Sequence, residues 1–376
     1  MAAGLTLEEA ARGIGMSGPA AKERLAEMER GELEPSRTQI AAMAKRYHRP
    51  LLTFYLNEPP KPGNRNQDFR MLPVRDPAHE ALLDAIVRDA RVRQALLRSA
   101  LEEEEQAEPL PVVGSVHENA SAEELRAAMA NALRFNLHDY RSARTIAEAF
   151  AILRSAVEAL GVYVLLIGNL GNYRSNVSPL VFRGFSFASA VAPFVVINET
   201  DAQSAWSFTL MHELAHVFLG QSDISGYGGD DRLERVCDDA ASAFLLPADE
   251  FLRLDVSAES PLETLIGDIS GLADDFKVSR TMVAYRLLCA GKLSAAKYAH
   301  LVQAFDSARE SRAQSKGGGG GPNYYVLRRH RLGKSLIGTV TRMVDAGALT
   351  TSKAGRVLGV KPTAVHRITT RGEGDA

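Results

Sequence analysis

Two histidines stand four residues apart in the apolar segment MHELAHVFLG, which covers residues 211–220. On an α-helix this spacing puts both side chains on one face, about one turn apart. His212 and His216 can then bind one metal ion, and about 2.0–2.1 Å is the usual zinc–nitrogen distance. The segment therefore has to form a helix, and that helix has to meet further ligands in a folded core.

Glu213 follows the first histidine and lies beside the same face of the predicted helix. A carboxylate in this place can take a proton from a water molecule whose pKa a metal lowers towards neutrality. The pattern fixes only three positions, so a chance occurrence in an amphipathic helix is the competing interpretation. The strand-like segments before it and the acidic helix after it favour the metal site.

A catalytic zinc keeps three protein ligands and one open position, so a further ligand must come from another segment. The next predicted helix, DRLERVCDDAASAFLLP, offers Glu234 and Asp238, which are four residues apart on one face. This spacing favours Glu234 as the third ligand and Asp238 as the acceptor for a ligating histidine's second nitrogen. Cys237 is interpreted as a small core residue. The acids that compete for the ligand role are Asp230, Asp231 and Asp239.

Helical patterns dominate the chain, and strand-like segments occur in one stretch. GVYVLLIG, VSPLVFRGFSFAS and APFVVINE are rich in β-branched and aromatic residues and predict three strands. Amphipathic helices are predicted before and after them. The sequence therefore predicts an α+β fold that is mostly helical. A small three- to four-stranded sheet is expected in the histidine-bearing core, flanked by helical N- and C-terminal domains.

The 376 residues are enough for two or three domains. We expect a helix-turn-helix domain over 1–57, a linker and long connecting helix over 58–115, and the metal-binding domain over 116–315. The tract KGGGGGP predicts a flexible linker over 316–322, because ordering glycine costs the most entropy. A helical C-terminal domain is expected over 323–376, and a solvated helix face is favoured over a phosphate contact for its basic cluster.

Composition limits the partners and the compartment. A net charge of -2 argues against a protein that mainly coats nucleic acid, although one small DNA-reading domain is compatible with it. Two cysteines are too few for a disulfide framework and suit a reducing compartment. The sequence contains neither a signal-peptide core nor an apolar run of membrane-spanning length. We therefore expect a cytoplasmic protein without a membrane partner.

The segments FRGFSFASAVAPFVVINETDAQSAWSFTLMHELAHVFLG and ERVCDDAASAFLLP resemble the ImmA/IrrE family of metallo-endopeptidases. The resemblance implies a gluzincin-like zinc site in a zincin-like core. It also implies cleavage of a partner regulator, such as a repressor in a stress response or in mobile-element control. The residues that carry these implied roles are the zinc ligands His212, His216 and Glu234 and the general base Glu213.

The N-terminal segment resembles the Xre-type helix-turn-helix through LTLEEAARGIG, ERLAEMERGELEPS and TQIAAMAKRYHRP. This resemblance implies transcription regulation through a DNA contact. The segment departs from that fold because the first helix has almost no room before Leu5. In addition, Gly18 and Pro19 stand where a recognition helix would start.

Two further features concern the substrate. The carbonyl oxygen of a tetrahedral intermediate needs a donor opposite the base, and Tyr227 and His300 are the candidates, each with a structural role as the alternative. A peptide substrate of such an enzyme adds as a strand to an exposed sheet edge. VSPLVFRGF is the candidate edge, and an ordinary core strand is an equal alternative.

Two functions follow from these patterns. The first is a zinc-dependent endopeptidase that cleaves a specific regulatory protein, a DNA-binding repressor, by attack of an activated water. The alternative is a DNA-binding transcriptional regulator or antitoxin-like protein that uses the peptidase domain for sensing or for protein contact. Replacing Glu213 with Gln separates the two, since only the first needs that carboxylate. Manganese or iron could occupy the same ligands as zinc.

Overall fold

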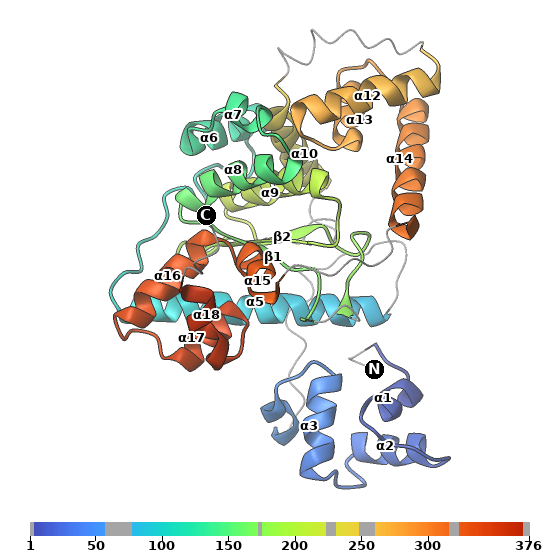
Figure 1. Ribbon diagram of the computed structural model, residues 1–376, viewed down its shortest axis with the longest axis vertical. Helices are drawn as coiled ribbons and strands as arrows, with labels where there is room; N and C mark the ends of the chain where they lie inside the picture. Colours follow the sequence, from blue (N-terminus) through green and yellow to red (C-terminus); the bar gives the residue numbers. More distant parts are fainter. Residues whose placement is uncertain are drawn as a thin grey trace.

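The computed structural model consists of helices around one small sheet (Figure 1). It describes residues 4–56, 77–171, 175–222, 231–247, 260–315 and 323–370. The strands are β1 (Tyr163–Leu166), β2 (Gly184–Phe187) and β3 (Phe194–Ile197). After the N-terminal segment the helices are α5 (Pro77–Glu103), α6 (Ala122–Leu133), α7 (Leu137–Arg141), α8 (Ile146–Ala159), α9 (Gln203–Phe218), α10 (Asp231–Leu245), α12 (Leu262–Phe276), α13 (Arg280–Cys289), α14 (Ala295–Ser315), α15 (Tyr324–Leu332), α16 (Lys334–Asp345), α17 (Thr351–Leu358) and α18 (Val365–Thr369). The predicted α+β class is confirmed.

The three strands form one mixed sheet in the order β1-β3-β2. β1 runs parallel to β3, and β2 runs antiparallel to it, so that Gly184 pairs with Ile197. Every strand residue is buried. Helices cover both faces, which explains why the strands read as continuous apolar runs. The three predicted strands are confirmed, and within the described residues no fourth strand joins them.

The sheet separates two hydrophobic cores. In β1, Val164 and Leu166 belong to one core, whereas Tyr163 and Leu165 belong to the other. Successive side chains of a strand point to opposite faces, so one strand serves both cores. Figure 1 shows α8 and α9 on one side of the sheet and α5 on the other.

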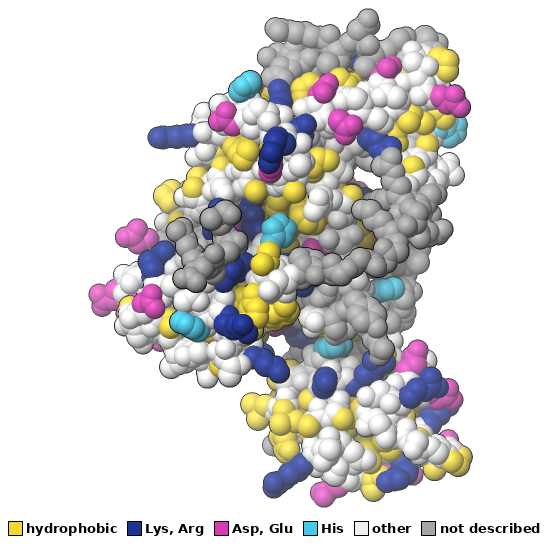
Figure 2. Space-filling view, viewed as in Figure 1, with side chains coloured by type: hydrophobic (Ala, Val, Ile, Leu, Met, Phe, Trp, Pro, Cys, Tyr) yellow, Lys and Arg dark blue, Asp and Glu magenta, His cyan; other side chains and the backbone are white. Residues whose placement is uncertain are grey.

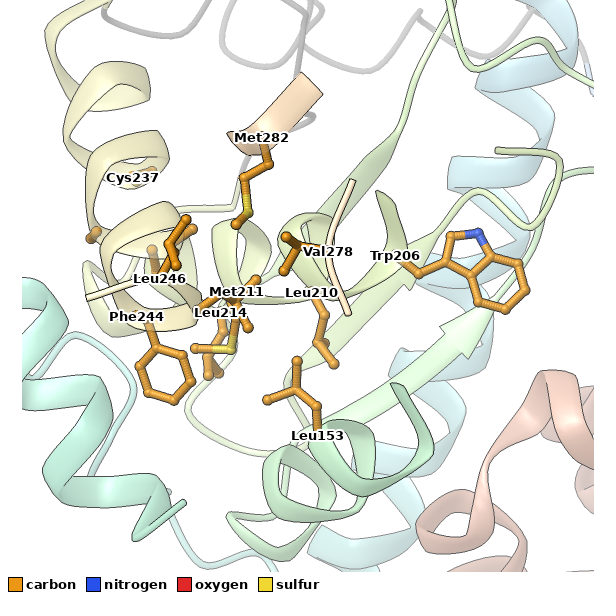
Figure 3. Close-up of a cluster of buried hydrophobic side chains, with 14 of the residues drawn as sticks. Leu153, Trp206, Leu210, Met211, Leu214, Cys237, Phe244, Leu246, Val278 and Met282 are labelled. Carbon is orange, nitrogen blue, oxygen red and sulfur yellow. The ribbon is translucent and has the colours of Figure 1, made fainter. Parts of the chain in front are cut away.

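The first core is built around α9. Figure 3 shows side chains of α8, α9, α10 and α13 meeting in one cluster. Leu210, Met211 and Leu214 of α9 are fully buried there. Trp206 of the same helix stacks edge-to-face on Phe150 of α8, with ring centroids 5.3 Å apart. Each buried side chain of this size contributes about 1.5–3 kcal/mol, so α9 is held firmly in place.

The second core joins α5 to the C-terminal helices. Leu336, Val340 and Leu358 of these helices are fully buried in it, together with Leu165 of β1. Figure 1 shows α15 to α18 gathered beside α5. The predicted glycine linker lies outside the described residues, and the domain boundaries stay predictions. The described C-terminal helices nevertheless complete the cover of one face of the sheet.

A buried ion pair connects the two sides of the sheet. Arg154 Nε of α8 lies 2.9 Å from Glu158 Oε1, and both side chains are more than nine-tenths buried. The Arg154 guanidinium also donates to the carbonyl oxygens of Val164 in β1 and of His330 and Arg331 in α15. Glu158 Oε2 accepts the backbone N–H of Ser335 at 3.0 Å. One charged pair thus links α8, β1 and the start of the C-terminal helices.

The N-terminal segment folds as three short helices and a 3₁₀ turn. Their bounds are α1 (Leu7–Gly13), α2 (Ala21–Glu29), α3 (Arg37–Arg46) and η1 (Leu51–Tyr55). Thr6 and Ser36 start α1 and α3 with capping boxes, in which each side chain satisfies a backbone N–H three residues on. Helices therefore occur where the sequence predicts them. Their assignment as a DNA-binding domain stays a prediction.

Candidate metal centre

Helix α9 carries both histidines and is buried along most of its length. It begins shortly after β3, and its apolar side chains face the first core. His212 is 4% exposed and His216 is fully buried. Their Nε2 atoms lie 3.1 Å apart. The four-residue spacing therefore brings one nitrogen of each ring to the same point.

Glu234 reaches this point from α10, which packs against α9. One of its oxygens lies 3.4 Å from His212 Nε2, and the other lies 3.3 Å from His216 Nε2. Four ligands at about 2.0–2.1 Å around tetrahedral zinc stand about 3.3–3.4 Å from one another. The three donors converge at nearly these separations, all within 4.8 Å of one another. The group therefore fits a divalent metal ion.

Charge in the centre favours a cation. Burial opposes ionisation of Glu234, but its hydrogen bonds with His212 and His216 outweigh burial and hold the pKa of Glu234 well below its usual range. Burial also opposes protonation of His212, whereas the carboxylates around it, Asp238 foremost, raise the pKa of His212 well above its usual value. Surroundings that attract a proton to this imidazole also attract a metal ion, and the two compete.

Two side chains of α10 lie next to the Nδ1 atoms of the histidines. His212 Nδ1 lies 2.9 Å from Asp238 Oδ1, one turn after Glu234 on α10. A carboxylate in this position favours the tautomer whose Nε2 lone pair faces the centre. His216 Nδ1 lies 3.9 Å from Sγ of the buried Cys237. Cys237 is thus a core residue that also packs behind a candidate ligand, which no sequence spacing indicated.

Glu213 is fully buried, and its side chain lies against the backbone of β2. A Cβ added at Gly184 would lie 2.8 Å from Glu213 Oε1 and 2.7 Å from Thr209 Cγ2. Both separations are shorter than van der Waals contact, so a side chain at this position would displace one of its neighbours. The absence of a side chain at Gly184 therefore leaves the room that the carboxylate occupies.

A cavity of about 520 Å³ opens at the centre. His212, Glu234 and Asp238 line it from one side, and residues 179–183, which lead into β2, line it from another. Within the described sheet β2 pairs only with β3, so it is an edge strand. The last two residues of the predicted edge VSPLVFRGF lie in β2, and the addition of a substrate strand there stays a prediction. The cavity therefore lies beside the segment that leads into this edge strand, and two of the three donor residues, His212 and Glu234, line it.

The other sequence candidates take different positions. Tyr227 and Asp230 lie outside the described residues. His300 is exposed on α14 and does not line the cavity. Asp239 accepts a hydrogen bond from the hydroxyl of Tyr285 at 2.9 Å. The remaining competitor for the ligand role, Asp231, is exposed at the start of α10.

Two tyrosines that no motif singles out line the same cavity, Tyr285 of α13 and Tyr298 of α14. Burial, followed by the charge of Asp238, raises the pKa of Tyr298, so its hydroxyl stays a donor at neutral pH. The hydroxyl of Tyr285 is already donated to Asp239. Tyr298 lies two residues from the candidate His300. No spacing in the sequence indicates that α13 or α14 packs near α9, so neither tyrosine could be selected from the sequence.

Residues 172–288 match the family model Peptidase_M78, described as an IrrE N-terminal-like domain. This range contains β2, β3, α9 and α10, and hence the histidines and both acids of the centre. The match supports the resemblance to the ImmA/IrrE family and a metallopeptidase type of domain. No curated protein and no solved structure matches the chain.

Proposed function

We propose that this protein is a zinc-dependent endopeptidase that cleaves a specific regulatory protein, a DNA-binding repressor. The convergence of His212 Nε2, His216 Nε2 and the Glu234 carboxylate at separations of 3.1–3.4 Å carries the proposal. Buried ligands that fit zinc, with an acid next to one of them, are the arrangement of hydrolytic zinc enzymes. The repressor as substrate rests on the ImmA/IrrE resemblance.

His212, His216 and Glu234 would hold the metal, and Asp238 would keep His212 in the binding tautomer. A zinc ion supplies Lewis acidity, which lowers the pKa of water to about 7 and stabilises a developing oxyanion. Glu213 accepts the proton of the attacking water and then delivers it to the leaving amine nitrogen. The same carboxylate, held against the backbone of β2, serves both proton transfers.

An extended peptide suits the cavity beside the centre. The edge strand β2 presents backbone donors and acceptors on the side that β3 does not use. A substrate that pairs there as an added strand runs past the three-donor group, and the chain can continue in both directions. This geometry favours cleavage within a protein over removal of a terminal residue.

Zinc content tests the proposed centre. Elemental analysis of the purified full chain is expected to give about one zinc per molecule for a site of this type. Glu234→Ala is expected to lose it, whereas Asp231→Ala, which removes an exposed acid of the same helix, keeps it. A metal-free wild type, or equal zinc in both variants, would contradict the proposal and favour the DNA-binding alternative.

Gly184→Ala is expected to lower kcat by about 100-fold, because a misplacement of about 1 Å in a catalytic group costs that much. The added methyl displaces the Glu213 carboxylate and leaves the metal ligands in place. The measurements are kcat on a cleaved peptide and zinc content. Gly267→Ala in α12 is the control, since its added Cβ has no atom within 4 Å. A kcat of Gly184→Ala equal to that of the wild type would show that the contact between Gly184 and Glu213 does not position the carboxylate of Glu213.

Tyr298→Phe is expected to lower kcat by about 10²–10³-fold, the usual loss of one oxyanion donor. The hydroxyl of Tyr298 is the candidate donor to the carbonyl oxygen of the substrate. Tyr285→Phe is the matched control, because its hydroxyl already bonds to Asp239. Steady-state kinetics on one peptide would compare the two. Equal kcat values in both variants would remove Tyr298 from the mechanism.

A further inference from the structure

A second cavity, of about 540 Å³, lies on the α5 side of the sheet. Residues of α5, of the connection after β1 and of the C-terminal helices line it. Figure 2 shows Lys and Arg side chains on the surface of these C-terminal helices. The cationic lining residues are Arg93, Arg328, Arg331, Arg356 and Lys361, and the carboxylates are Asp89 and Glu199.

Two of these arginines converge at one point. The Arg93 side chain is only 8% exposed. An added Cβ at Gly359 would lie 2.4 Å from Arg93 Cζ and 2.6 Å from Arg328 Nη2. The two guanidinium groups therefore approach the same glycine from α5 and from α15. Within the described residues, the Nε atoms of Arg93 and Arg328 are buried without a hydrogen-bond partner.

The carboxylates of the cavity leave much of this charge unbalanced. Asp89 pairs with Arg93 at 2.5 Å, and Glu199 pairs with Arg331. Arg328 donates to the backbone carbonyl oxygens of Leu358 and Gly359, which carry no net charge. Burial, followed by the positive charge of Arg93, lowers the pKa of Arg328 to about 10. Cations so close together repel one another, and a bound anion would remove that cost.

The form of the cavity indicates the size of the anion. Arg93 is too deeply buried for the backbone of a long polymer to reach, whereas Arg356 and Lys361 are exposed at the rim. Leu170, Tyr324 and Pro362 add apolar wall. Its volume is in the range of sites for small molecules, about 300–1,000 Å³. We propose that this cavity binds the phosphate group of a small phosphate-bearing molecule through Arg93 and Arg328.

Guanidinium groups suit this chemistry. Arginine presents several N–H donors in a planar fork that matches phosphate oxygens, and the bonds are strengthened by charge. Arg93 and Arg328 both line the cavity, so their guanidinium groups can donate to the phosphate oxygens from two helices. The site is separated from the metal centre by the sheet, so binding can be measured whether or not the chain hydrolyses peptides.

Calorimetric titration of the full chain with inorganic phosphate, and separately with AMP, tests the proposal at constant ionic strength. Saturable binding of both probes to the wild type is expected. Arg356→Ala/Lys361→Ala removes two exposed rim cations and is expected to weaken binding about 10- to 100-fold, as loss of charged hydrogen bonds does. Lys353→Ala, which removes an exposed cation of α17 that does not line the cavity, is expected to bind within about twofold of the wild type.

Arg93→Gln tests the buried end of the cavity in the same titration. It is expected to bind neither probe measurably, while its far-UV circular dichroism and its thermal midpoint without phosphate show a folded chain. No saturable binding by the wild type would overturn the proposal, as would equal binding by the double variant and the wild type. Binding of duplex DNA through these cations, without binding of phosphate or AMP, would assign them to a nucleic acid and overturn it as well.

Discussion

On the proposed mechanism, Glu213→Gln is expected to lower kcat by about 10²–10⁴-fold without loss of the bound metal, because a general base contributes about that factor. The amide has the size of the carboxylate and cannot accept the proton of the attacking water. Glu213 is fully buried against Gly184 of β2, so the amide would stand in the place of the carboxylate.

The measurement is mass spectrometry of new protein N-termini in cells that produce either the wild type or Glu213→Gln. We expect one or a few cleavage products, from a DNA-binding regulator, in the wild type alone. Asp231→Asn is the control, because it removes a charge from an exposed acid near the centre. Equal amounts of the same products in the Glu213→Gln cells would refute the role of this carboxylate, even if metal is bound.

Arg154→Met is expected to lower the free energy of unfolding by about 3–5 kcal/mol, the usual cost of removing one partner from a buried ion pair. Glu158 would remain as a buried charge with the backbone N–H of Ser335. The loss is a large part of a typical stability of about 5–15 kcal/mol. Carbonyl oxygens of β1 and α15 would also lose their donor.

Urea unfolding followed by circular dichroism measures this loss, and Arg144→Met is the matched control. Arg144 pairs with Glu148 at 3.1 Å near the start of α8, but its side chain is 88% exposed. Exposed pairs of this kind contribute about 0.3–0.5 kcal/mol. Similar midpoints for the two variants would show that the Arg154 pair does not hold the two sides together.

Local spacing in the sequence predicts those parts of the centre that lie on one helix. The four-residue spacing of His212 and His216 fixes a shared face, and the same spacing relates Glu234 to Asp238. The strands were also predictable, since short runs rich in β-branched and aromatic residues, with Gly or Pro near their ends, are typical of buried strands. The role of Asp238 as an orienting group stays a proposal. So do the ligand roles of His212, His216 and Glu234.

Contacts between segments that are distant in the sequence could not be predicted from local spacing. Gly184 meets Glu213 only because β2 folds beside α9, and a lone glycine before FSF is equally typical of a turn or a strand end far from any acid. Tyr298 reaches the cavity through the packing of α14, whereas the neighbouring candidate His300 turns outward. The basic residues around Arg328 read as a solvated helix face. Folding instead places Arg328 beside Arg93, more than two hundred residues away in the sequence.

The sheet between the two cores has a consequence for cooperativity. Because β1 gives alternate side chains to each core, melting of either side would expose apolar strand surface to water. The cost of that exposure couples α9 to the C-terminal helices. The coupling does not need a shared cavity, since α9 lines only the cavity at the metal centre and the C-terminal helices line only the cavity on the α5 side. A ligand that binds on the α5 side would therefore also protect the backbone amides of α9 from hydrogen exchange.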